Sequence, residues 1–192
     1  VGARVGAASS TASAAVNGNL LFLDKGQIEQ QAEALPDDRV GGKFVQVATP
    51  EDIYVKPASL SVARLFGDPS INTAETVVKA GGKGAGLSLG GTEVAIAAEY
   101  KGLAGKRVVF GIRPEAIEIK SSKSSGIPAE IVAVTPLNER TVLLLKAADG
   151  WEFLASLPAS AKAPEPGTKV AASFASSDIH FFDTASGERL HG

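Results

Sequence analysis

The chain has 192 residues, enough for one ordinary domain or for one domain with an appendage. Its 44% hydrophobic and 21% charged residues are typical of a folded soluble protein and exclude an intrinsically disordered one. The formal net charge of −2 argues against a nucleic-acid partner, and the lack of cysteine excludes disulfides, thiolate zinc sites and cysteine nucleophiles.

Residues 1–48 show little regular pattern. Residues 1–16 lack the continuous apolar stretch of a signal peptide, and no part of the chain approaches the roughly 18–20 apolar residues that span a bilayer. We therefore expect no direct membrane insertion. Leu20–Leu23 is the one strand-like run in this part. Because the chain contains no methionine, even at position 1, we expect a fragment or a processed product.

Residues 49–67 predict two short helices joined at Lys56-Pro57. Thr49 suits the N-cap of the first helix, because its hydroxyl can accept a bond from a free backbone N–H, and a proline follows at the first helical position. We expect Pro57 to open the second helix and Gly67 to end it. The predicted buried stripe consists of Leu60, Ala63, Leu65 and Phe66.

From residue 75 onward the hydrophobic period is two, which indicates strands. Glycine, proline and serine turns separate the strands, so we expect a mainly β fold with a short helical N-terminal part. Ile131–Val134 and Val142–Leu145 are apolar enough to predict burial on both faces. Asp-Gly in 148–150 predicts a hairpin. The predicted strands are 76–80, 86–89, 93–98, 107–112, 116–119, 128–135, 140–147, 151–157, 169–175 and 179–182.

The glycine-rich segment 81–91, GGKGAGLSLGG, resembles a phosphate-binding loop only in composition. A P-loop has four residues between its glycines and a lysine followed by serine or threonine at the start of a helix. Here Lys83 precedes glycine, and the next residues predict a strand. We therefore expect hairpin glycines.

Neither histidine nominates a metal site. His180 lies in a predicted strand beside two phenylalanines, and His191 is near the terminus. Two isolated histidines in a chain without cysteine make a weak ligand set. The serine-rich segment 121–125 predicts a solvated loop, because the sequence has no nucleophile-elbow motif.

Arg113-Pro114-Glu115 interrupts an apolar strand at a point where proline cannot donate to a sheet. The two charged side chains could satisfy each other or cap neighbouring backbone. A catalytic role would require a second carboxylate or a base nearby, and the sequence nominates none. We therefore predict a structural corner and no catalytic residues.

Three segments in the same order resemble ATP-binding subunits of carbohydrate ABC importers of the maltose and glycerol-phosphate type. T-P-E-D-I-Y through G-D-P-S-I-N at 49–72 is similar to the segment that follows their nucleotide-binding domain. F-G-I-R-P-E-A-I at 110–117 is similar to a V-G-I-R-P-E-x-I corner in their C-terminal domain. I-H-F-F-D-T-A-S-G-E-R-L at 179–190 is similar to their terminal hairpin.

The resemblance fails upstream. The family's Walker A loop, signature loop and switch histidine find no match in this sequence. Leu20–Asp24 could be a Walker B strand ending at Asp24, but Lys25 would then replace the essential glutamate. The run 20–30 could instead be an early strand–turn–strand of the ATPase domain, and it also echoes the hairpin at 42–46.

The resemblance implies three parts: a possible remnant of an ABC nucleotide-binding domain over 1–48, a helical connector over 49–72, and a TOBE or OB-like regulatory barrel over 73–192. It implies a homodimer bound to integral-membrane permease subunits on the inner face of the cell membrane. ATP and Mg belong to the parent family, and we expect no cofactor and no metal in this chain, so its status as an enzyme stays open. The resemblance nominates four aromatic residues for the core or an interface: Phe66, Phe110, Phe181 and Phe182.

The implied function is the regulatory and dimerisation portion of the ATP-binding subunit of a sugar importer, whose parent protein couples ATP hydrolysis to solute uptake. Two alternatives stay open at this point. One is an oxyanion or small-ligand sensor, since related barrels bind oxyanions. The other is a nucleotide hydrolase with degenerate motifs.

Overall fold

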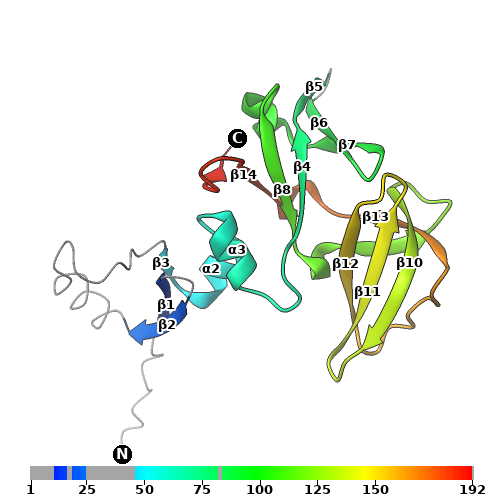
Figure 1. The fold of residues 1–192 in the computed structure, drawn as a ribbon, viewed down its shortest axis with the longest axis horizontal. Helices are drawn as coiled ribbons and strands as arrows, with labels where there is room; N and C mark the ends of the chain where they lie inside the picture. Colours follow the sequence, from blue (N-terminus) through cyan, green and yellow to red (C-terminus); the bar gives the residue numbers. More distant parts are fainter. Residues whose placement is uncertain (1–10, 17–18, 25–45, 82–83, 192) are drawn as a thin grey trace, which may run out of the picture. The chain divides into compact units, whose positions relative to one another are not determined.

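The computed structural model describes residues 11–16, 19–24, 46–81 and 84–191 of the chain (Figure 1). Lys25 and Lys83, on which two of the motif arguments turn, lie outside the described residues. The chain divides into two compact units, Val1–Gly67 and Asp68–Gly192. The division lies within the predicted 49–72 connector.

The first unit contains a small antiparallel sheet and two short helices. The sheet has the strand order β2-β1-β3, with Thr11 of β1 paired to Asp24 of β2. Its strands are β1 (Thr11–Val16), β2 (Asn19–Asp24) and β3 (Val47–Ala48), and its helices are α2 (Pro50–Val55) and α3 (Leu60–Leu65).

Local capping fixes both helix starts. The Thr49 hydroxyl accepts a bond of 3.1 Å from the backbone N–H of Asp52, so Thr49 is the predicted N-cap of α2. The prediction for α3 is wrong by three residues: Ser59, not Pro57, precedes the helix, and its hydroxyl accepts from the Val62 N–H at 3.3 Å. A hydroxyl that satisfies a free N–H is a stronger start signal than the fixed φ of proline.

The predicted apolar stripe of α3 is also wrong in part. Val62 and Ala63 are buried, but Leu65 keeps 40% of its surface exposed. Leu60 and Phe66 are half-buried. The inward face of α3 is therefore centred on Val62 and Ala63.

The second unit is mainly β, as predicted, and contains three antiparallel sheets (Figure 1). The five-stranded sheet has the order β12-β11-β10-β13-β9, and the four-stranded sheet has the order β15-β14-β8-β4. A small sheet, β5-β6-β7, completes the unit. The strands are β4 (Asn72–Val77), β5 (Lys79–Gly81), β6 (Gly84–Leu89), β7 (Thr92–Ile96), β8 (Arg107–Ile112), β9 (Glu118–Ser121), β10 (Ile127–Pro136), β11 (Arg140–Ala147), β12 (Glu152–Pro158), β13 (Lys169–Ser173), β14 (Ile179–Asp183) and β15 (Arg189–Leu190).

Three short 3₁₀ segments lie between consecutive strands in the described part of this unit. They are η1 (Ala98–Leu103), η2 (Pro114–Ala116) and η3 (Ser176–Asp178). The predicted strand 93–98 therefore ends two residues early, where η1 begins. Tyr100 and Leu103 of η1 are buried, so this segment closes part of the core.

One hydrophobic core connects all three sheets of the second unit. Fully buried members come from β6, β8, β10, β11, β12, β13 and β14, and large ones among them are Leu87, Phe110, Ile131, Leu143, Leu145 and Phe181. Alternate residues of each strand supply these side chains, as the period-two pattern predicts. This shared core is the reason the three sheets form one compact unit.

The expectation of burial on both faces of β10 and β11 is wrong. Ile131, Leu143 and Leu145 are fully buried, but Val132 is 45% exposed and Leu144 is half-buried. The five-stranded sheet therefore has one core face and one outward face that carries apolar side chains.

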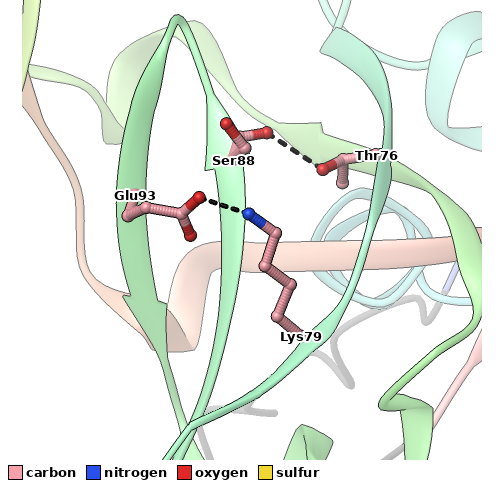
Figure 2. A network of polar contacts seen from close by, with 4 residues as sticks. All are labelled: Thr76, Lys79, Ser88 and Glu93. Atoms are coloured by element: carbon pink, nitrogen blue, oxygen red, sulfur yellow. Dashed lines mark hydrogen bonds and ion pairs between the residues drawn. The ribbon is translucent and has the colours of Figure 1, made fainter.

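The glycine-rich segment is a pair of hairpins, as predicted. Gly81 pairs with Gly84 between β5 and β6, and a tight turn with positive φ at Gly90 joins β6 to β7. Figure 2 shows how polar contacts hold this small sheet: the Thr76 hydroxyl donates to the Ser88 carbonyl at 2.9 Å, tying β4 to β6. Lys79 of β5 forms an ion pair with Glu93 of β7 across the sheet.

The predicted hairpin at 148–150 is also confirmed. Gly150 has φ of +91°, and the Asp149 carboxylate accepts from the Trp151 N–H at 2.9 Å. Lys146 and Glu152 are then cross-strand partners in β11 and β12.

Candidate functional site

The predicted corner begins where β8 ends. Ile112 is the last residue of β8, Arg113 is extended, and Pro114 opens the single turn η2. The Ala116 N–H donates to the Arg113 carbonyl at 3.1 Å and closes this turn. Because proline has no N–H to donate, the strand ends here and the chain turns toward β9.

The three corner residues differ in burial. Arg113 is 5% exposed and Pro114 is buried, whereas Glu115 is exposed to solvent. The turn η2 lies against the edge strand β12. The corner therefore connects the four-stranded sheet to the five-stranded sheet.

Asn72 makes a second connection between the same two sheets. Its side-chain amide donates to the Leu154 carbonyl at 2.8 Å and accepts from the Leu154 N–H at 2.7 Å. Asn72 is 7% exposed and opens β4, while Leu154 lies in β12, at the edge of the five-stranded sheet. One amide side chain thus supplies the donor and the acceptor that a neighbouring strand would supply.

Asn72 is not among the site residues that the sequence predicted. The signal was its position as the last residue of the G-D-P-S-I-N motif at 67–72. Asp68, in the same motif, pairs with Arg140 of β11 at 3.1 Å between carboxylate and guanidinium. Asp68 is almost fully exposed, so this pair contributes little to stability.

Gly111, in the F-G-I-R-P-E motif, lies in a tightly packed position. A Cβ at this position would lie 3.0 Å from Cε2 of Phe182 and 3.1 Å from Cδ1 of Ile71. Gly111 pairs with His180 on β14 and with Thr73 on β4. The glycine therefore lets side chains from both flanking strands approach the middle of β8.

His180 is a buried neutral histidine. It is 6% exposed, and its Nδ1 has no hydrogen-bond partner among the described atoms. Burial, followed by the charges of Arg189 and Arg113, lowers the pKa of His180 to about 4. The imidazole is consequently uncharged at neutral pH. Among the residues that the structure describes, no group of three His, Cys, Asp or Glu side chains could hold a metal ion.

The four nominated aromatic residues divide into two groups. Phe110, Phe181 and Phe182 are fully buried, and the rings of Phe110 and Phe181 meet edge-on at 6.3 Å. Phe110 and Phe181 belong to the shared core, whereas Phe182 is buried outside it. Phe66, which follows α3, is half-buried and retains surface for contact with another molecule.

Asp24, the candidate Walker B residue, is the last residue of β2. That strand pairs antiparallel with β1 in a small three-stranded sheet. The structure does not bring Asp24 together with the corner residues in one compact unit. Its role stays a prediction.

The corner and the Asn72 contact act by packing and hydrogen bonding. Asn72 bonds to backbone and Arg113 is buried, an arrangement suited to holding two sheets together, while Glu115 stays exposed. A catalytic site would need a nucleophile and a base that share a cavity with a substrate.

Within the described part of the chain, no helix is long and apolar enough to cross a membrane.

Two family models match residues of the second unit of the chain. Residues 67–117 match the MalK OB fold domain, and residues 110–182 match the TOBE domain. Residues 67–182 therefore match an OB-fold and a TOBE domain model, and the resemblance found in the sequence is confirmed.

The chain is also similar to curated ATP-binding proteins. The chain is 32% identical over 149 residues to the sn-glycerol-3-phosphate import ATP-binding protein UgpC of Salmonella typhimurium, covering 78% of this chain and 41% of UgpC. It is 36% identical over 152 residues to the multiple sugar-binding transport ATP-binding protein MsmK of Streptococcus mutans, covering 74% of this chain and 39% of MsmK. The chain thus spans about two fifths of the length of these relatives.

A solved structure, the molybdate-bound cytoplasmic molybdate-binding protein ModG, is a more distant match. Its TM-score is 0.47 at 17% identity, and the match covers 57% of this chain and 94% of ModG.

Proposed function

We propose that the chain is the regulatory and dimerisation portion of the ATP-binding subunit of a sugar ABC importer. The observation that carries this proposal is the match of residues 67–182 to the MalK OB fold and TOBE models, together with relatives whose names describe import ATP-binding proteins. In the parent protein, ATP hydrolysis would drive solute uptake.

The motif residues support a role in assembly. Asn72 and the Arg113–Glu115 corner join two sheets into one rigid unit, and such a unit can hold two subunits together while other domains move. In this proposal residues 49–72 connect that unit to the ATPase domain, of which residues 1–48, including Asp24, are a remnant.

The remaining partners follow from the same proposal. Two copies of the subunit would bind integral-membrane permease subunits at the inner face of the cell membrane. ATP and Mg would bind to the ATPase domain of the parent protein. The names of the two relatives, one for sn-glycerol-3-phosphate import and one for sugar-binding transport, leave the solute of this system open.

Two measurements on the purified chain test this proposal. Sedimentation equilibrium should detect a reversible dimer, and titration with a fluorescent nucleotide should show no saturable binding. A monomer at every concentration would contradict the dimerisation role. Saturable nucleotide binding would support a nucleotide hydrolase instead, and a rise in melting temperature with molybdate or sulfate would support an oxyanion sensor.

A further inference from the structure

The outward face of the five-stranded sheet carries a row of alternating charges. Glu130 of β10 is the direct cross-strand partner of Lys146 on β11 and of Lys169 on β13. Lys146 is in turn the partner of Glu152 on β12, at 3.6 Å between ammonium and carboxylate. The charged row, Lys169-Glu130-Lys146-Glu152, therefore crosses four strands as plus, minus, plus, minus. All four side chains are exposed.

An apolar row runs beside the charged row on the same face. Val132, Leu144 and Leu154 each lie two residues from a member of the charged row along their own strand, so their side chains share its face. Val132 is 45% exposed and the two leucines are half-buried, with Leu144 paired directly to Leu154. A register shift between Ile131 and Ala133 marks a bulge at Val132.

A hollow of about 570 Å³ opens over the charged row. Its lining includes three members of the charged row, with Pro128 and Val170 at its side. Of the apolar row, Val132 lines it. The depression therefore lies mainly over the charged row and meets the apolar row at Val132.

The order of the charges is complementary to itself. When a second copy packs face to face about a two-fold axis parallel to the strands, the row is reversed. Lys169 then faces Glu152 of the partner subunit, and Lys146 faces Glu130 of the partner subunit. The same axis brings the two apolar rows opposite each other. A two-fold axis along the row would instead oppose lysine to lysine, so the charges select one orientation.

We propose that two copies of the chain associate through this outward face, with the charged rows opposed in reverse order and the apolar rows in contact. The inference rests on the proposed dimerisation role and assigns it to a specific surface. The occupant is a second copy because a single row of four alternating charges is complementary to its own reversed order. The apolar row supplies the desolvated contact, and the charges supply orientation.

Complementary charge reversals test the proposal in the full chain. In a Glu130→Lys homodimer, lysine faces lysine twice, and in a Lys146→Glu homodimer, glutamate faces glutamate twice. Each variant alone should therefore dimerise at least about tenfold more weakly than wild type in sedimentation equilibrium. An equimolar mixture should recover a heterodimer of wild-type affinity, because every opposed pair is again opposite in charge. Native mass spectrometry identifies the heterodimer by its mass.

Lys79→Glu and Glu93→Lys provide the matched control. They alter another exposed cross-strand ion pair, on β5 and β7, and change the net charge by the same amounts. They should leave dimerisation unchanged, and circular dichroism should confirm that all four variants fold. A wild-type dimer that tolerates both row reversals overturns the assigned face while the dimerisation role stands. A wild-type monomer overturns both.

Discussion

Asn72 joins two sheets through hydrogen bonds from one side chain to the edge strand β12. Its amide satisfies both backbone groups of Leu154 from a position where no strand pairs with β12. Asn72→Ala removes both partners and leaves a donor and an acceptor without their bonds. We expect it to lower the free energy of unfolding by about 2–3 kcal/mol in urea denaturation. Asn138→Ala, at an exposed loop position, should change it by less than about 0.5 kcal/mol.

Asn72→Asp gives an independent check at the same position. The carboxylate keeps an acceptor for the Leu154 N–H but opposes an oxygen to the Leu154 carbonyl. It should therefore also destabilise the protein. Stability equal to that of wild type in both variants would show that the amide does not join the sheets.

His180 predicts a pH dependence of stability. Its folded-state pKa of about 4 lies below the unfolded value of 6.5, so the unfolded chain takes up the proton first as pH falls. The contribution of the neutral histidine to the free energy of unfolding is complete above about pH 6.5. It is lost as pH falls to about 4, which lowers the free energy of unfolding by about 2–3 kcal/mol. His180→Gln should flatten this part of the curve of unfolding free energy against pH.

His191→Gln is the control, because it removes the other histidine at an exposed position. Backbone N–H groups of Ser186 and Ala185 lower the pKa of the Asp183 carboxylate, so Asp183 also contributes to the loss of stability at acid pH. The difference between wild type and His180→Gln isolates the histidine. If His180→Gln keeps the wild-type slope between pH 4 and 6.5, the buried histidine does not cause it.

At the scale of elements, the β6–β7 hairpin depends on close packing at its turn. Gly90 has φ of +61°, and a Cβ there would lie 2.5 Å from Cγ2 of Ile127 and 2.9 Å from Cβ of Ala147. Gly90→Ala should therefore lower the melting temperature, because backbone strain and a steric clash together reduce the free energy of unfolding by about 3 kcal/mol. Gly105 has φ of +81°, but a Cβ there would have no atom within 4 Å. Backbone strain alone should therefore lower the free energy of unfolding of Gly105→Ala by about 1 kcal/mol. Equal losses for the two variants would contradict the packing argument.

At the scale of the whole molecule, the shared core lies entirely within the second unit. Its members run from Val78 to Phe181, with Leu190 packed against it. We expect residues 68–192 alone to unfold in one cooperative transition, because small domains with one core do so. In calorimetry, the van't Hoff enthalpy of unfolding should equal the calorimetric enthalpy. A broad transition without that agreement would mean that the unit needs residues 1–67.

The sequence by itself determined the local features of this protein. The Thr49 cap, the hairpins at 81–91 and 148–150, and the end of β8 at Pro114 depend on hydroxyls, glycine and proline, whose preferences act over a few residues. The motif order also determined the family. Alternation along the strands predicted a mainly β fold, because side chains on one face recur every second residue.

Only the tertiary structure decided which of these residues meet. The Asn72–Leu154 contact joins positions 82 apart, and neither residue carries a local pattern that predicts it. The outward exposure of Val132 and the charged row likewise arise from strand order and register, which bring β13, β10, β11 and β12 side by side. Short-range preferences fix the strands, but pairing between distant strands selects the faces that pack and the face that stays exposed.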